Sequence, residues 1–344
     1  MRKMTKAALA AGLLLAAVGS AHAQTATDTL AAVKARGVVN CGVNTGLAGF
    51  GIPDSKGAWT GLDVDVCRAV AAAVLGSGDK VKFFPLDAQQ RFQALQSGSV
   101  DILSRNTTFT LTRDTSLGLS FAPVTFYDGQ GFMVPKSLGV KSAKELAGAT
   151  ICVQPGTTTE QNLADYFRSN KLEFKPVVIE QLAEVENAFF SGRCDAYTTD
   201  ASGLASTRAA RAAKPDDYVI LPERISKEPL APAFRSSDVA WGKVISWTIY
   251  ALEQAEESGI TAANIDDQKA NSTDPSVKRL LGVTPGLGKA LGLDESWAYN
   301  AIKAEGNYGE IFERNVGAAT PLKLERGQNA LWNKGGLIYP VPLR

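Results

Sequence analysis

Residues 80–103 run KVKFFPLDAQQRFQALQSGSVDIL, and this stretch contains the pattern that decides the fold. It predicts a strand over residues 80–84, a helix over residues 88–97 and a second strand over residues 100–103. The same alternation of strand and helix returns over residues 150–198. Such alternation predicts an α/β fold in which mostly parallel sheets are flanked by helices.

The second half of the chain repeats a feature of the first half. The segment SGSVD at residues 97–101 is similar to SGRCD at residues 191–195, and each joins a predicted helix to a predicted strand. The spacing between these two segments also separates Asn106 from Asp200, so these two residues correspond to each other. Both follow the end of a predicted strand. Ligands of parallel sheets bind outside the carboxyl ends of the strands, so we expect both residues to face a cleft between two lobes.

Composition and charge exclude several classes of protein. The 344 residues are 45% hydrophobic and 21% charged, which is typical of globular domains and not of disordered chains. Residues 1–23 combine a basic start, an apolar run and the tripeptide AHA, which predicts a signal peptide cleaved after Ala23 and a periplasmic location. Cleavage removes more basic than acidic residues, and a weakly acidic secreted chain is not expected to bind nucleic acid.

The same cleavage removes His22, the only histidine in the sequence. A mature chain without histidine excludes histidine-dependent catalytic triads and histidine-ligated zinc. We therefore expect no metal site and no cofactor.

Four cysteines remain, namely Cys41, Cys67, Cys152 and Cys194. Export and an even number of cysteines favour disulfides. Cys41 lies in a predicted strand and Cys67 on the apolar stripe of the helix expected to pack on it, while the other two lie in strands of the second repeat. We expect the pairs Cys41–Cys67 and Cys152–Cys194, and small buried hydrophobic side chains are the alternative.

The polar segment SRNTTFTLTR, residues 104–113, follows a predicted strand. It concentrates hydroxyl, amide and guanidinium groups at one edge of the expected sheet. Arg113 could hold a carboxylate through two parallel hydrogen bonds, which a lysine cannot do. A solvated loop with a surface arginine is the alternative.

Two further positions favour charged ligand groups. Thr157 and Glu160 form a capping-box pattern, so the free backbone N–H groups near Thr158 could bind a carboxylate, although a plain helix start explains the same residues. Asp200 could bind an ammonium group, unless it caps a helix that begins at Ala201.

Seven motifs spread over most of the chain carry a family resemblance: CGV (41–43), GLDVDVCRA (61–69), SRNTT (104–108), YDGQGF (127–132), QPGTTT (154–159), YTTD (197–200) and GNYGE (306–310). Together they resemble the periplasmic solute-binding proteins of polar amino acid ABC importers, the bacterial extracellular solute-binding protein family 3, in its general L-amino-acid-binding branch. The resemblance implies a two-lobed, type II periplasmic binding protein fold with two hinge strands and no catalytic activity.

The resemblance also implies a division of the chain. Residues 24–129 and 231–344 would form the first lobe, and residues 130–230 the second. Residues from about 272 to 344 would be an extension packed on the first lobe. Hinges are expected at two segments, residues 127–132 and 225–230.

By motif position, Arg113 would bind the α-carboxylate of an amino acid, helped by Thr108 and Thr158. Asp200 would bind the α-ammonium, helped by Thr108 and the carbonyl oxygen of Asn106. Burying either charge of this zwitterion without a partner costs several kcal/mol, whereas each charged hydrogen bond returns about 1.5–3 kcal/mol. Acid and base on opposite lobes would therefore favour closure around the ligand.

Three neighbouring positions bear on specificity. Asn44 stands where many relatives carry an acid near the ligand, so the resemblance does not imply a preference for side chains with a charged ammonium group. Ala88 stands where relatives often carry an aromatic lid, and the missing lid implies a roomier, more tolerant pocket. Phe50, in the glycine-rich segment 44–51, could cover an apolar part of the ligand, and a flexible loop is the alternative.

The expected function is that of a periplasmic monomer that captures free L-amino acids and delivers them to an inner-membrane ABC permease. Its preference would be broad, or for polar and acidic amino acids and their amides. Two rivals remain open, namely an exported enzyme on the same fold, such as a cyclohexadienyl dehydratase, and a soluble amino acid sensor.

Overall fold

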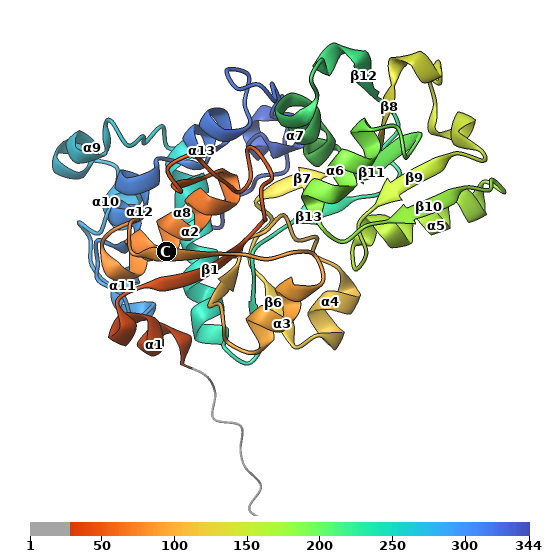
Figure 1. The fold of residues 1–344 in the computed structure, drawn as a ribbon. Helices are drawn as coiled ribbons and strands as arrows, with labels where there is room; N and C mark the ends of the chain where they lie inside the picture. The colour runs from red at the N-terminus through yellow and green to blue at the C-terminus, as the bar shows by residue number, and fades with distance from the viewer. Residues whose placement is uncertain (1–27) are drawn as a thin grey trace, which may run out of the picture.

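The computed structural model describes residues 28–344, which form two five-stranded sheets with helices packed around them (Figure 1). The predicted signal peptide, residues 1–23, lies outside the described residues. The two-lobed α/β architecture expected from the sequence is confirmed.

The first sheet contains, in spatial order, β4 (Val81–Pro85), β1 (Val39–Val43), β5 (Ile102–Leu103), β14 (Ala233–Arg235) and β6 (Leu119–Phe121). The second contains β10 (Lys175–Val178), β9 (Thr150–Val153), β11 (Ala196–Asp200), β8 (Gln130–Pro135) and β12 (Tyr218–Ile220). One strand in each sheet, β14 or β8, is antiparallel to its two neighbours. The other strands share one direction, so each sheet is mostly parallel, as predicted.

A separate two-stranded ladder lies between the sheets. It pairs β7 (Phe126–Asp128) with β13 (Glu228–Leu230) in antiparallel register. The chain passes from the first sheet to the second directly after β7, and it returns directly after β13 (Figure 1). These strands overlap the two segments expected to be hinges, while the exact lobe boundaries stay a prediction.

Helices cover both sheets. The first sheet is accompanied by α1 (Thr29–Arg36), α2 (Leu62–Leu75), α3 (Gln90–Gln96), α4 (Leu111–Ser116) and α8 (Val239–Glu257). The second is accompanied by α5 (Thr158–Ser169), α6 (Leu182–Phe190) and α7 (Ala201–Arg211). None of the helices within residues 28–344 is both long enough and apolar enough to span a bilayer.

Helix α2 shows how local sequence builds the first lobe. It begins after Gly61, whose φ of 134° and contact with Phe50 exclude a side chain, since a Cβ would lie 2.1 Å from the Phe50 carbonyl oxygen. The helix is apolar on almost all sides, so it is buried between the sheet and later helices.

Both predicted disulfides are confirmed. Cys41 in β1 bonds to Cys67 in α2, and Cys152 in β9 bonds to Cys194 just before β11. Each bond therefore lies within one lobe, and all four cysteines are paired.

Helix α9 (Ile265–Asn271) precedes the expected C-terminal extension, which adds four helices to the first lobe: α10 (Pro275–Leu280), α11 (Leu287–Ala290), α12 (Trp297–Glu305) and α13 (Tyr308–Asn315). Helix α12 packs on α2 and α8. The extension also reaches the hinge region, because Tyr308 Oη donates to the Thr125 carbonyl (2.8 Å) and Asn329 hydrogen-bonds the backbone of Tyr127. Packing on the first lobe was expected, whereas contact with the hinge was not.

Candidate ligand-binding cleft

A narrow hollow of about 40 Å³ lies where the two sheets face each other. It brings together five of the seven ligand-binding residues expected from the sequence, namely Asn44, Asn106, Thr108, Thr158 and Asp200. The first three come from the first lobe and the other two from the second. The hollow has room for little more than water, so a whole amino acid could enter only if the two walls moved apart.

Asp200 ends β11 and precedes α7, but its side chain does not cap that helix. Asp128 takes the place of the cap, because its Oδ2 accepts from Ser202 N (3.2 Å). The carboxylate of Asp200 is thereby left available to the hollow, although it is only 6% exposed. Burial, together with the negative charges of Asp128 and Glu228, raises the pKa of Asp200 well above its ordinary value.

Asn106 is held in a left-handed backbone conformation with φ of 37°, which asparagine tolerates better than most residues. Its N–H donates to Asp63 Oδ2 (2.7 Å), and its Oδ1 accepts from Asn44 Nδ2 (2.9 Å). Asp63, in the first turn of α2, also accepts from Ser104 Oγ (3.0 Å). The loop after β5 is therefore fixed against α2, and burial raises the pKa of Asp63 to about 6.

Arg113 stands behind the hollow and does not line it. Its Nη1 donates to the Thr108 carbonyl oxygen (2.8 Å), and its guanidinium carbon lies 5.1 Å from the centre of the Phe92 ring. Burial lowers the pKa of Arg113, and the negative charges of Glu228 and Asp200 offset part of that effect. The negative charge of Asp200 in the second lobe is therefore close enough to affect the pKa of Arg113 in the first lobe.

Thr158 begins α5, whose N-cap Thr157 accepts from Glu160 N (3.1 Å), as the capping pattern predicts. The reciprocal half of the predicted capping box differs, because the Glu160 carboxylate accepts from Gly156 N (2.9 Å) and not from Thr157 N. The Thr158 hydroxyl faces the first lobe, and its oxygen lies 3.3 Å from Thr108 Oγ1. Two residues that were expected to serve one ligand from opposite lobes are therefore neighbours.

Glu228 in the hinge strand β13 is a central acceptor that sequence reasoning missed. Its Oε2 accepts from Thr108 Oγ1 (2.6 Å) and Thr158 Oγ1 (2.8 Å), and its Oε1 accepts from Asn162 Nδ2 (2.8 Å) and Ser226 Oγ (2.6 Å). One buried carboxylate thus joins the hinge to both lobes. A hydroxyl that donates to Glu228 keeps only its lone pairs for a ligand.

Phe50 is not brought to the hollow. It is 1% exposed and packs edge-on against Phe126, with the ring centres 5.2 Å apart. The glycine-rich segment therefore places this ring in the core beneath the hinge strand β7. Ala88 is buried as well, without lining the hollow.

Two buried arginines line the hollow and were not assigned from the sequence. Arg105 lies in the polar segment after β5 and donates from Nε to the Leu86 carbonyl oxygen (2.9 Å), and burial lowers its pKa to about 10. Arg91 lies in the first turn of α3. A positive charge near the N-terminus of a helix is unfavourable, so an arginine in the first turn was the sequence signal that could have revealed this residue.

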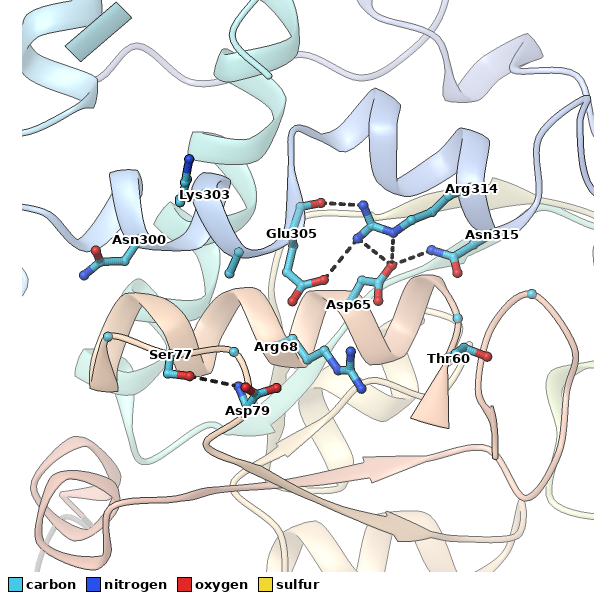
Figure 2. A pocket seen from close by; sticks show the side chains of 15 residues that line it. Thr60, Asp65, Arg68, Ser77, Asp79, Asn300, Lys303, Glu305, Arg314 and Asn315 are labelled. Atoms are coloured by element: carbon cyan, nitrogen blue, oxygen red, sulfur yellow. Dashed lines mark hydrogen bonds and ion pairs between the residues drawn. The ribbon is translucent and has the colours of Figure 1, made fainter. Parts of the chain in front are cut away.

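A larger hollow of about 870 Å³ lies elsewhere, between α2 and the C-terminal helices (Figure 2). Its charges are neutralised mainly by one another: Arg314 Nη2 lies 2.7 Å from Asp65 Oδ2 and 3.1 Å from Glu305 Oε2. This hollow is lined by the first lobe and the extension alone, so it lacks the opposed lobes of the narrow cleft. We therefore place the candidate site in the cleft. The residues that the structure describes contain no group of side chains suited to holding a metal ion.

Comparison with known proteins gives a consistent result. Residues 39–318 match the model of the bacterial extracellular solute-binding proteins, family 3. The chain is 58% identical to the general L-amino acid-binding periplasmic protein of Rhizobium johnstonii, over 99% of each chain. It is 55% identical to the glutamate/glutamine/aspartate/asparagine-binding protein of Rhodobacter capsulatus, over 99% of this chain and all of the relative.

A solved structure is similar over most of the chain. The periplasmic binding protein from Brucella ovis with glutathione bound is 58% identical and superimposes with a TM-score of 0.90, covering 92% of this chain and 99% of that one. A cysteine-binding protein from Campylobacter jejuni is 27% identical, with a TM-score of 0.60 over 73% of this chain and 97% of that one.

Proposed function

The chain belongs to the bacterial extracellular solute-binding proteins, family 3, and on that premise we propose that it captures free L-amino acids by closing its two lobes around them. The observation that carries the proposal is the placement of opposite charges. Asp200 lines the hollow from the second lobe, while Arg113 stands behind the opposite wall, where it donates to the backbone of Thr108, a lining residue of the first lobe.

An L-amino acid complements this arrangement. Its carboxylate would lie between the Arg113 guanidinium and the N-terminus of α5 at Thr158, where the helix dipole favours an anion. Its ammonium would lie against Asp200 and the carbonyl oxygen of Asn106. Because both charges would be satisfied only with the lobes together, binding shifts the protein toward the closed state.

The biological setting follows from the relatives. The Rhizobium and Rhodobacter proteins are named as amino-acid-binding, and two Escherichia coli relatives at 50–51% identity as putative amino-acid ABC transporter-binding proteins. We infer that this chain is a monomer that acts in the periplasm after cleavage of residues 1–23. It would present the closed, loaded form to an inner-membrane ABC permease, without chemical change to the ligand.

The test is a thermal-shift panel of the twenty L-amino acids, followed by calorimetry of those that raise the melting temperature. A bound ligand raises the melting temperature according to its concentration relative to its Kd. NMR of the recovered ligand should show it unchanged. If no amino acid shifted the melting transition at millimolar concentration, the proposal would be wrong.

A further inference from the structure

The glycine-rich segment 44–51 of the first lobe is hydrogen-bonded to the second lobe through Ala48. Ser206 Oγ in α7 donates to the Ala48 carbonyl oxygen (2.8 Å). Ser206 is 1% exposed, so the bond is buried in the contact between the lobes. Neither residue lines the ligand-binding hollow or belongs to the hinge strands β7 and β13. The bond therefore joins the two lobes independently of both the ligand and the hinge.

Ala48 differs from its neighbours in the origin of the donor that its carbonyl group receives. Four neighbouring carbonyl groups accept from backbone N–H groups of the first lobe, namely those of Leu47, Gly49, Phe50 and Gly51. The Ala48 carbonyl accepts from the second lobe instead. Among these five groups, it is therefore the one that would lose its protein partner when the lobes separate.

The segment that presents Ala48 is packed on the C-terminal extension. Gly49 has a φ of 81°, and a Cβ at this position would lie 2.8 Å from a side-chain carbon of Leu322 and 2.9 Å from one of Val316. A larger residue could not take this place without displacing the backbone, so the absence of a side chain permits the close contact. A flexible loop was the alternative expected here, whereas the backbone is both hydrogen-bonded and packed.

Ser206 is held in place within the second lobe. The next residue, Thr207, donates from Oγ1 to Glu186 Oε1 in α6 (2.8 Å), and Arg211 Nε lies 3.2 Å from Glu186 Oε2. Both contacts fix α7 to α6. Gly203, one turn before Ser206 in α7, lines the ligand-binding hollow. A movement of α7 that opens the hollow would therefore also break the bond to the first lobe.

We propose that the Ser206–Ala48 hydrogen bond is a closure latch, in which Ser206 is a positioning residue that stabilises the closed state whichever amino acid is bound. The inference rests on the proposed function, because it concerns the closure by which the ligand is captured. In the open state water satisfies both groups, so the bond contributes free energy to the closed state. A change confined to the open–closed equilibrium alters the apparent affinity of every ligand by the same factor.

The experiment combines calorimetry with stopped-flow measurement of ligand dissociation, on the full secreted chain dialysed free of bound ligand. Glutamate, glutamine, alanine and serine are the probes, and Ser206→Ala is the variant. It should raise the Kd of each ligand by the same factor, about three- to tenfold, which corresponds to one hydrogen bond between neutral groups. The increase should appear in the dissociation rate, because the ligand leaves only after the lobes separate.

Thr207→Val is the matched control, because it removes an equally buried hydroxyl from the adjacent residue, whose hydrogen bond stays within the second lobe. It should lower the melting temperature of the ligand-free protein and leave the four dissociation rates unchanged. Ser206→Ala should do the opposite. Its ligand-free form should melt like the wild type, because under the proposed function that form is open and the latch is not made.

The outcomes separate the latch from the proposed function. If Ser206→Ala keeps the wild-type Kd values and dissociation rates, or changes the four ligands by different factors, the latch is overturned and amino acid capture stands. A lower melting temperature with unchanged dissociation rates would likewise overturn it. If the wild-type chain binds none of the four, nor any other amino acid of the panel, both the latch and the proposed function are overturned.

Discussion

Asn329 satisfies both backbone groups of Tyr127 in the hinge strand β7. Its Oδ1 accepts from Tyr127 N (2.6 Å), and its Nδ2 donates to Tyr127 O (3.1 Å). The side-chain amide of Asn329 thus pairs with the backbone of β7 as a neighbouring strand would. Asn329 lies beyond residue 318, where the family match ends. The C-terminal extension is therefore part of the hinge as well as a layer on the first lobe.

Asn329→Ala should loosen this hinge. It leaves the N–H and the carbonyl of Tyr127 without partners, which costs about 1–3 kcal/mol of unfolding free energy when such groups are buried. Urea unfolding measures the loss. Asn271→Ala, on the exposed face of α9, is the control and should change stability by less than about 0.5 kcal/mol. Equal stability of the two variants would contradict the hinge contact.

Arg113→Ala should abolish most amino acid binding. A carboxylate held by two charged hydrogen bonds loses about 3 kcal/mol or more, which is a hundredfold or greater increase in Kd. Calorimetry with the strongest ligand of the panel measures the effect. Arg168→Ala, which removes an exposed arginine from α5, should bind like the wild type; near-native affinity of Arg113→Ala would remove Arg113 from the site.

Asp200→Asn should separate binding from stability. The pKa of Asp200 lies well above its unfolded value of about 3.8, so its contribution to stability falls as pH rises between those two values. The amide removes this penalty, and the free variant should melt at the same or a higher temperature at pH 7. Affinity for amino acids should nevertheless drop at least tenfold. Parallel losses of melting temperature and affinity would point to a structural role instead.

Glu253 in α8 should make the protein less stable in alkali. Burial, with a smaller effect from Glu256, raises the pKa of Glu253 to about 8 from 4.5. The folded state then holds a proton that the unfolded state has lost, so the unfolding free energy falls as pH rises from about 4.5 toward 8. Glu253→Gln should flatten the decline in melting temperature between pH 5 and 9. Glu184→Gln, at an exposed position of α6, should leave that slope as it is in the wild type.

Thiol titration of the denatured, unreduced protein should detect no free sulfhydryl, since both pairs are bonded. The double variant Cys152→Ser/Cys194→Ser should lose about 3–4 kcal/mol of unfolding free energy, because its unfolded chain is no longer constrained by the disulfide and gains conformational entropy. Denaturant titration with and without reductant checks this, and identical curves for the oxidised and reduced wild type would argue against it.

The sequence predicted the elements well because they depend on local patterns, and it predicted the disulfides because each pair lies within one repeat of strands and helices. Helix α6 begins at Leu182 and ends at Phe190, as expected, and β1 and β9 differ from expectation by one residue. Asp200 was expected just beyond a strand and is instead the last residue of β11.

The site was harder to predict because it depends on contacts between distant segments. Glu228 occupies a three-residue strand with no pattern of its own, and its importance arises from hydroxyl groups brought by both lobes. Phe50 was assigned by its place in a loop, whereas the packing of Phe126 decides where its ring lies.

The location of the two disulfides governs how the molecule would respond to mechanical load. Each bond closes a loop inside one lobe, over sequence separations of 26 and 42 residues, and neither crosses the β7–β13 ladder. If a single oxidised molecule were stretched from its termini, the disulfides would carry the force and the residues inside the two loops could not be extended. Reduction would release roughly 20 nm of additional contour length. Under tension, the oxidised chain thus behaves as two disulfide-bonded lobes joined by hinge strands that no disulfide constrains.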